Sequence, residues 1–276
     1  MSRPKAIHVK SAGDLRKALR ELNMSREQFN KKVVIDEGAT DCSNMFADFT
    51  SFNQKVVVPA SVTNVDRMFD GCKSFNSEVV FKCKPTRMAS TFCGCESFNQ
   101  PVAIPKTVMS LDSTFRGCTN FNQPITLPKS LVSAWGTFAY CEKFNQELII
   151  PEKCNYTSDM LIGCTSFNSS VEFLCKETMT CEGMFEDCRA FNKLIKLPEG
   201  GEFFQGMFRR CTSLNQDIKF PDIPIDCQEM FTDCTSLNAI TTYPKNAYRC
   251  WHMFHKCAKK MFVPYDFHWP RAQEKF

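Results

Sequence analysis

Hydrophobic positions along this chain recur with a period of about 23 residues, and one short phrase marks each recurrence. The phrase Met68–Asn76 returns at 91–99 and again at 114–122. Its most constant position, the anchor column, holds Phe46, Phe69, Phe92, Phe115, Phe138, Leu161, Phe185, Phe208, Phe231 and Phe254. Eight of the nine intervals are 23 residues and one, Leu161 to Phe185, is 24. This period predicts a solenoid with one repeat per turn, and the extra residue predicts a bulged turn near Glu177–Thr180.

Each turn carries its own pattern of inward positions. Cysteine stands three residues after nearly every anchor, and Phe or Leu stands six after it. Ten and twelve residues after it, apolar pairs such as Val56/Val58 and Leu148/Ile150 alternate as in a strand, and proline usually follows. We therefore expect a leucine-rich-repeat-like solenoid with one short parallel β-strand per turn and irregular or short helical turns opposite. Neighbouring turns share one core.

The two ends depart from the repeat. Residues 5–10 alternate like a strand, Ser11-Ala12-Gly13-Asp14 resembles a capping box, and Ser25–Gln28 resembles the start of a second, shorter helix. We expect an N-terminal α/β cap over residues 1–28, a solenoid of about ten turns over 29–257, and an aromatic C-terminal cap over 258–276. The alternative for the C-terminal segment is a docking peptide for a partner.

One outward column changes character along the array. This exposed strand column holds Val34, Val57, Val80, Ala103, Thr126, Ile149, Glu172, Lys196 and Lys219. Its first six members are apolar or nearly so, and the later ones are polar. A contiguous apolar strip on an exposed face is typical of a contact surface, so the column predicts a binding face. The alternative is that β-branched residues simply suit strands.

An asparagine column follows the second Phe/Leu position. It holds Asn30, Asn53, Asn76, Asn99, Asn122, Asn145, Asn168, Asn192, Asn215 and Asn238. We interpret it as a structural ladder in which each side chain bonds to backbone of its own and the next turn. A polar binding strip is the alternative.

Composition adds a constraint on the compartment. Fourteen of the seventeen cysteines fall in columns of small apolar residues, which favours reduced core thiols and a cytoplasmic, reducing location. The run Cys250-x-His252-x-x-His255-x-Cys257 offers four zinc ligands, and Cys93-x-Cys95 is a close pair. The two histidines of the run occupy solvent-type positions while its cysteines occupy inward ones. We therefore expect no metal and no cofactor.

Other function classes find little support in the sequence. The net charge of +4 is too small to indicate nucleic-acid binding. No apolar run approaches a membrane span, and the N-terminus has no signal-peptide core. No phosphate loop, nucleophile elbow or paired-carboxylate motif is present, so the sequence does not predict an enzyme.

The columns together resemble a known family. The pattern Phe-x-Gly-Cys-x-Ser-Phe-Asn-Gln-Pro-hydrophobic-x-hydrophobic-Pro is similar to BspA-type (Treponema pallidum-type) leucine-rich repeats and to a related bacterial surface-protein repeat. The resemblance covers about residues 29–257. It implies a binding solenoid; members are often surface proteins or adhesins, and similar arrays occur in protists, phages and large viruses.

These observations predict a non-enzymatic scaffold that binds another protein through the exposed sheet face. The alternative is a cell-surface or virion adhesin that recognises a host protein or a glycan. On the sheet face, an exposed cluster of aromatic rings and carboxylates would favour glycans, and the exposed columns have few aromatic residues there. The identity of the partner does not follow from the sequence.

Overall fold

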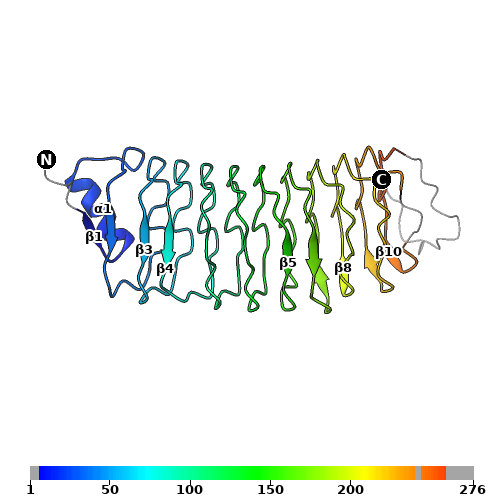
Figure 1. Ribbon diagram of the computed structural model, residues 1–276, viewed down its shortest axis with the longest axis horizontal. Helices are drawn as coiled ribbons and strands as arrows, with labels where there is room; N and C mark the ends of the chain where they lie inside the picture. Colours follow the sequence, from blue (N-terminus) through cyan, green and yellow to red (C-terminus); the bar gives the residue numbers. More distant parts are fainter. Residues whose placement is uncertain (1–5, 240–243, 259–276) are drawn as a thin grey trace, which may run out of the picture.

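The protein is a long solenoid whose turns stand side by side along one axis (Figure 1). The computed structural model describes residues 6–239 and 244–258. The N-terminal turns lie at one end of the array and the turns near residue 250 at the other (Figure 1). The expected leucine-rich-repeat-like solenoid is therefore confirmed. The expected C-terminal cap, residues 258–276, lies outside the described residues apart from Ala258.

The N-terminal segment begins with strand β1 (Ile7–Val9) and helix α1 (Ala12–Glu21). Ser11 caps the helix: its Oγ accepts the N–H of Asp14 at 3.2 Å, and the Asp14 carboxylate accepts the N–H of Ser11 at 3.0 Å. This reciprocal pair satisfies backbone donors that the first helical turn leaves free. Strand β1 then pairs in parallel with β2 (Val33–Ile35), so the segment extends the array by one strand.

The prediction of a second, shorter helix that starts at Ser25–Gln28 is wrong. This stretch forms a turn, in which the N–H of Phe29 donates to the carbonyl oxygen of Arg26 at 3.2 Å. Phe29 is fully buried and already belongs to the first layer of the core. The chain must therefore turn inward before a helix can form.

The expected strand column is hydrogen-bonded in pairs rather than continuously. Strand β3 (Val56–Val58) pairs with β4 (Val79–Phe81), and β5 (Leu148–Ile150) pairs with β6 (Val171–Phe173). Each pair joins residues 23 apart, as the period requires. The equivalent stretches at 102–104, 125–127, 195–197 and 218–220 follow the same course without regular strand pairing.

A second ladder, which the sequence did not indicate, runs along another side of each turn. Strands β7 (Met179–Thr180), β8 (Gly201–Phe203), β9 (Ile225–Asp226) and β10 (Ala247–Arg249) form one parallel sheet. Isolated bridges continue this ladder towards the N-terminus. A proline-led turn separates the two ladders, as where the N–H of Val62 donates to the carbonyl oxygen of Pro59. The extra residue of the sequence lies between Phe173 and Thr180, as expected, because β5 and β6 pair residues 23 apart whereas Tyr156 bridges to Thr180, 24 residues later.

Two stacks of phenylalanine rings fill the core. In the anchor column, neighbouring rings such as Phe69 and Phe92 lie 5.4 Å apart and within 2° of parallel. In the second column, Phe75 and Phe98 lie 5.7 Å apart. Within a turn, Phe69 and Phe75 stack on each other at 4.5 Å. Each buried ring contributes about 1.5–3 kcal/mol of transfer free energy, so the stacks account for much of the cohesion between turns.

Left-handed backbone recurs two residues before and two residues after the anchor in all ten turns. Arg67 (φ 57°) and Gly71 (φ 73°) are the two such residues around Phe69. With this geometry, Arg67, Phe69 and Gly71 direct their N–H groups along the array. They donate to carbonyl oxygens of the next turn at 2.9, 2.8 and 2.7 Å. Neighbouring turns are thus hydrogen-bonded even where no strand forms.

The cysteine column is also hydrogen-bonded between turns. Each of its nine Sγ atoms donates to the carbonyl oxygen of the anchor residue one turn earlier, at 2.9–3.1 Å. A thiol fits this position because it is small and apolar yet still offers a weak donor. Burial raises the pKa of Cys141 well above its ordinary value, and the neighbouring thiols Cys118 and Cys164 raise it further.

The asparagine column makes an equally regular set of contacts. The Oδ1 atom of each asparagine from Asn30 to Asn215 accepts the backbone N–H of the next asparagine in the column, at 2.7–2.9 Å. In many turns the residue after the asparagine adds a side-chain bond to the same oxygen, as Gln146 does to Asn122 at 2.9 Å. How much these bonds stabilise the array remains to be measured.

We expect Asn122→Ala to lower the free energy of unfolding by about 1–3 kcal/mol, because two hydrogen bonds between turns are lost: the Asn122 side chain accepts from the N–H of Asn145 and from the side-chain amide of Gln146. For a chain of this size the melting temperature should fall by about 2–10 °C, measured by circular dichroism. Lys129→Ala, an exposed change in the same turn, is the matched control. Equal melting temperatures for the two variants would contradict a stabilising role.

Thiol reactivity should follow burial. In native protein at pH 8, iodoacetamide should modify Cys93, Cys250 and Cys257, which are partly exposed, before Cys118 or Cys141. Burial raises the pKa of Cys93 and of Cys257 to about 11, so even these carry only ~0.1% thiolate at that pH and react slowly.

Unfolded, unreduced protein should take up seventeen labels, counted by mass spectrometry. Early labelling of Cys118 would show that the core opens readily. A shortfall of label in the unfolded protein would show that some of the cysteines pair.

Candidate functional site

The residues of the exposed strand column do face solvent. Ile149 and Val57 are 57% and 40% exposed, although both are large and apolar. Val34 and Val80 are half-buried, and the other members are exposed: Ala103, Thr126, Glu172, Lys196 and Lys219. The column therefore offers an accessible strip whose N-terminal half is apolar, and its role in binding remains a prediction.

A groove opens at the N-terminal end of this strip, between strands β2 and β3. These strands are neighbours, but they belong to two different hydrogen-bonded pairs, β1–β2 and β3–β4. The groove has a volume of about 470 Å³. Its walls are Lys32, Val33, Val34, Ile35, Glu37, Lys55, Val57 and Pro59. An apolar floor with two lysines at the rim suits an apolar side chain of a partner protein.

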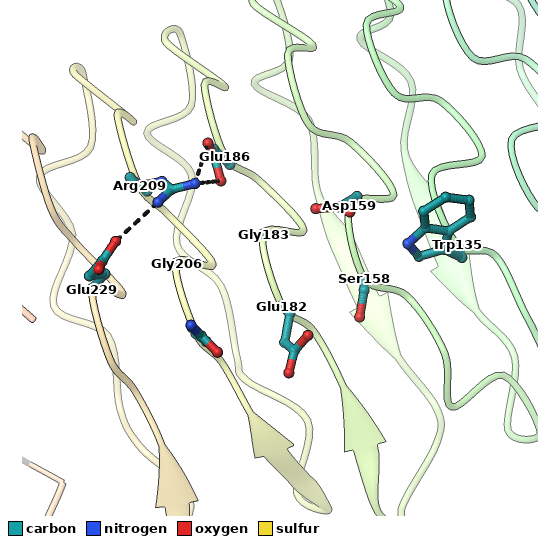
Figure 2. A pocket seen from close by; sticks show the side chains of 10 residues that line it. Trp135, Ser158, Asp159, Glu182, Gly183, Glu186, Gly206, Arg209 and Glu229 are labelled. Atoms are coloured by element: carbon teal, nitrogen blue, oxygen red, sulfur yellow. Dashed lines mark hydrogen bonds and ion pairs between the residues drawn. The ribbon is translucent and has the colours of Figure 1, made fainter. Parts of the chain in front are cut away.

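A second groove, the acidic groove, lies near the second ladder. Figure 2 shows Trp135 at one end and Glu229 at the other, with Asp159, Glu182 and Glu186 between them. Its volume is about 360 Å³. It spans five successive turns, because its residues occupy equivalent positions around the anchors from Phe138 to Phe231.

Glycine opens the floor of the acidic groove. Gly183 and Gly206 stand two residues before their anchors, in left-handed backbone, where other turns carry side chains such as Arg67. A Cβ atom on Gly183 would lie 2.5 Å from Oδ1 of Asp159. The position must therefore be glycine if the Asp159 carboxylate is to lie where it does.

One wall of the acidic groove is an ion-pair network. Glu186, whose side chain is only 7% exposed, pairs with Arg209 at 2.7 Å and also with Arg210. Arg209 reaches Glu229 at 3.0 Å, and Arg210 reaches Asp187 at 3.0 Å. Such a network holds both guanidinium groups in place, because each contacts two carboxylates.

Asp159 and Glu182 stand apart from this network. Neither forms an ion pair within the part of the chain that the structure describes. The pKa of Asp159 is raised above its ordinary value, first by burial and then by the Glu186 carboxylate. The Trp135 side chain, as a hydrogen-bond donor, and the guanidinium groups of Arg116 and Arg209 counteract this only in part. Burial and the neighbouring carboxylate thus disfavour the charged form of Asp159.

The Cys250–Cys257 run does not form a metal site in residues 6–239 and 244–258. Across these ranges no three side chains of His, Cys, Asp or Glu come together as metal ligands. Cys257 directs its Sγ to the carbonyl oxygen of Phe231, whereas His252 and His255 are exposed. The four side chains point in different directions because the turn alternates inward and outward positions.

Sequence reasoning did not find the acidic groove. Its signals were weak ones: a tryptophan at position 135 in a column of mostly small or polar residues, and glycine at 183 and 206. The acidic residues Asp159, Glu182 and Glu186 fall in three different columns, since they come from different positions in two successive turns. Only the stacking of the turns brings them together.

No helix among the described residues has the length and apolar character needed to cross a bilayer. No curated protein matches the chain. The solved structures that match are leucine-rich repeat proteins, and the likeness concerns the fold alone.

A leucine-rich repeat protein from Eubacterium ventriosum is 14% identical, with a TM-score of 0.44, over 87% of this chain and 86% of that one. The T. pallidum protein TpLRR is 18% identical, with a TM-score of 0.38, over 66% of this chain and 77% of that one. A leucine-rich cell surface protein from Faecalibacterium prausnitzii is 16% identical, with a TM-score of 0.40, over 82% and 78%.

One family model matches in overlapping segments along almost the whole array. The matched residues are 17–104, 40–149, 86–199, 137–244 and 202–262. Together they cover the solenoid and part of the N-terminal segment. The chain belongs to the family described as "Mycoplasma protein of unknown function, DUF285".

Proposed function

We propose that the protein is a non-enzymatic scaffold that binds another protein through its exposed strand column. The observation that carries this proposal is the apolar N-terminal half of the column, where Val57 and Ile149 remain exposed on a hydrogen-bonded strand. Exposed apolar side chains in a row are costly in water unless a partner covers them. In the second half of the column, Glu172, Lys196 and Lys219 replace them, which gives the strip a defined end.

The groove between β2 and β3 gives the proposed partner a stated chemistry. Val34 and Val57 offer contact area for an apolar side chain, while Lys32 stands at the edge beside Lys55, which already pairs with Glu78 at 2.7 Å. A loop or strand that presents an aliphatic residue beside a carboxylate would match both features. A glycan is a poorer match here, because the column contains no aromatic ring.

A reducing compartment, such as the cytoplasm, is part of the same proposal. Cysteine side chains donate hydrogen bonds between turns along the array, and a disulfide would remove the donors it uses. An oxidising location would expose seventeen thiols to pairing during folding. The division into a cap at 1–28, an array at 29–257 and a cap at 258–276 remains a prediction.

The proposal is tested by a paired substitution on the apolar half. Val57→Glu with Ile149→Lys should abolish capture of the partner in an affinity pull-down from the native source, because both side chains become charged at the contact. Both residues are exposed, so the melting temperature should change by less than about 2 °C, as expected for surface substitutions.

The matched control reverses charge in the polar half of the same column, Glu172→Lys with Lys196→Glu. It should retain the partner captured by the wild-type protein. A partner that survives the Val57/Ile149 change, or is lost equally with the control, would show that the apolar strip is not the contact surface.

A further inference from the structure

We propose that the acidic groove is a second binding site, and that it takes an extended basic segment of a partner protein. An arginine or lysine side chain of that segment would lie between Trp135 and the carboxylates of Asp159 and Glu182. The groove lies apart from the exposed strand column, so this inference does not depend on the strip being a contact surface.

The charge balance of the groove supports a cationic ligand. The ion-pair network is balanced: Arg189, Arg209 and Arg210 contact Asp187, Glu186 and Glu229. Among the described residues Asp159 and Glu182 form no ion pair, and Arg116 acts on Asp159 only from a distance, so the groove keeps a negative balance although the chain as a whole carries a net charge of +4. A local negative charge on a positive protein selects for a positively charged partner.

The aromatic end of the groove fits the same ligand. Trp135 is 46% exposed, and its ring stands beside Asp159 at the end of the groove (Figure 2). A cation over an indole face is attracted by the ring quadrupole, most strongly when a guanidinium stacks on it. Asp159 would at the same time accept hydrogen bonds from that guanidinium, so two independent contacts favour one group.

An unsatisfied hydrogen-bond donor of the protein suits the main chain of a bound peptide as well as its side chain. Nε of Arg209 is buried and has no hydrogen-bond partner. It lies 4.0 Å from the place that a Cβ on Gly206 would occupy, so the free space above Gly206 faces it. A main-chain carbonyl oxygen of a peptide in the groove would supply an acceptor there, with a small shift of the guanidinium. An extended peptide thus offers partners for both ends of the groove.

A neutral glycan accounts for fewer of these observations. It would stack on Trp135 and offer hydroxyl groups to Arg209, but it carries no charge to offset Asp159 and Glu182. Burial and the Glu186 carboxylate raise the pKa of Asp159, so its charged form is disfavoured; a cation beside it would stabilise that form, whereas a neutral hydroxyl group would do so less.

The test uses the full chain and a heptapeptide with blocked termini, acetyl-Gly-Ser-Arg-Gly-Arg-Ser-Gly-amide. Binding is measured by isothermal titration calorimetry at low salt. The comparison peptide has citrulline in place of both arginines, which preserves shape and removes charge. We expect the arginine peptide to bind one per chain and at least about tenfold more tightly than the citrulline peptide. Added salt should weaken its binding.

Asp159→Asn with Glu182→Gln should weaken binding of the arginine peptide at least about tenfold, because the shape of the groove is retained while both unpaired charges are lost. Trp135→Ala alone should also weaken binding of the arginine peptide. Glu152→Gln, an exposed carboxylate outside the groove, is the control and should bind as the wild type does. Thermal melting of each variant confirms that it is folded.

Four results would overturn the inference: no binding of the arginine peptide, equal binding of the citrulline peptide, equal binding by the Asp159/Glu182 variant, or tighter binding of a neutral oligosaccharide. The Val57/Ile149 variant should still bind the peptide normally. Failure of this site and failure of the exposed strand column can therefore be told apart.

Discussion

Contact between equivalent residues of neighbouring turns is the interaction on which the rest of this structure depends. Phe69 stacks on Phe92 at 5.4 Å, and the backbone around each anchor donates to the next turn. No turn could bury its own ring alone, so each is stable only between neighbours. This explains how a chain with short, interrupted strands forms one continuous core. It also explains why each inward-facing column holds so few residue types.

The outward positions are free of that constraint, and they differ from turn to turn. Left-handed backbone two residues before each anchor accepts glycine without strain but also holds Arg67 or Glu229. Glycine stands there in three turns, at Gly136, Gly183 and Gly206, and the last two line the acidic groove. One rigid backbone thus presents either a closed surface or a groove, depending on which side chains successive turns place around this position.

The period, the inward columns, the capped first helix and the place of the extra residue before Thr180 could all be predicted, because each follows from spacing and from residues adjacent in sequence. The second ladder could not, since the residues that form its bridges, from Asp41 through Tyr156 to Arg249, follow no single residue type or hydrophobic pattern. Strand interruptions at 102–104 and 125–127 were also missed: alternation reports which side chains are buried, not how the backbone bonds. The acidic groove depends on Asp159 and Glu182 meeting across two turns, which single-turn patterns do not show.

A stack of equivalent turns has a further geometric consequence. Each turn adds one strand spacing, about 4.8 Å, so distances along the array are whole multiples of a fixed step. The groove at Val34 and Val57 and the carboxylates of Asp159 and Glu182 are separated by about five such steps, or roughly 25 Å. Gain or loss of a single 23-residue unit between them would change that interval by one step and leave both surfaces intact. The number of turns between two surfaces therefore fixes the distance between them in steps of one strand spacing.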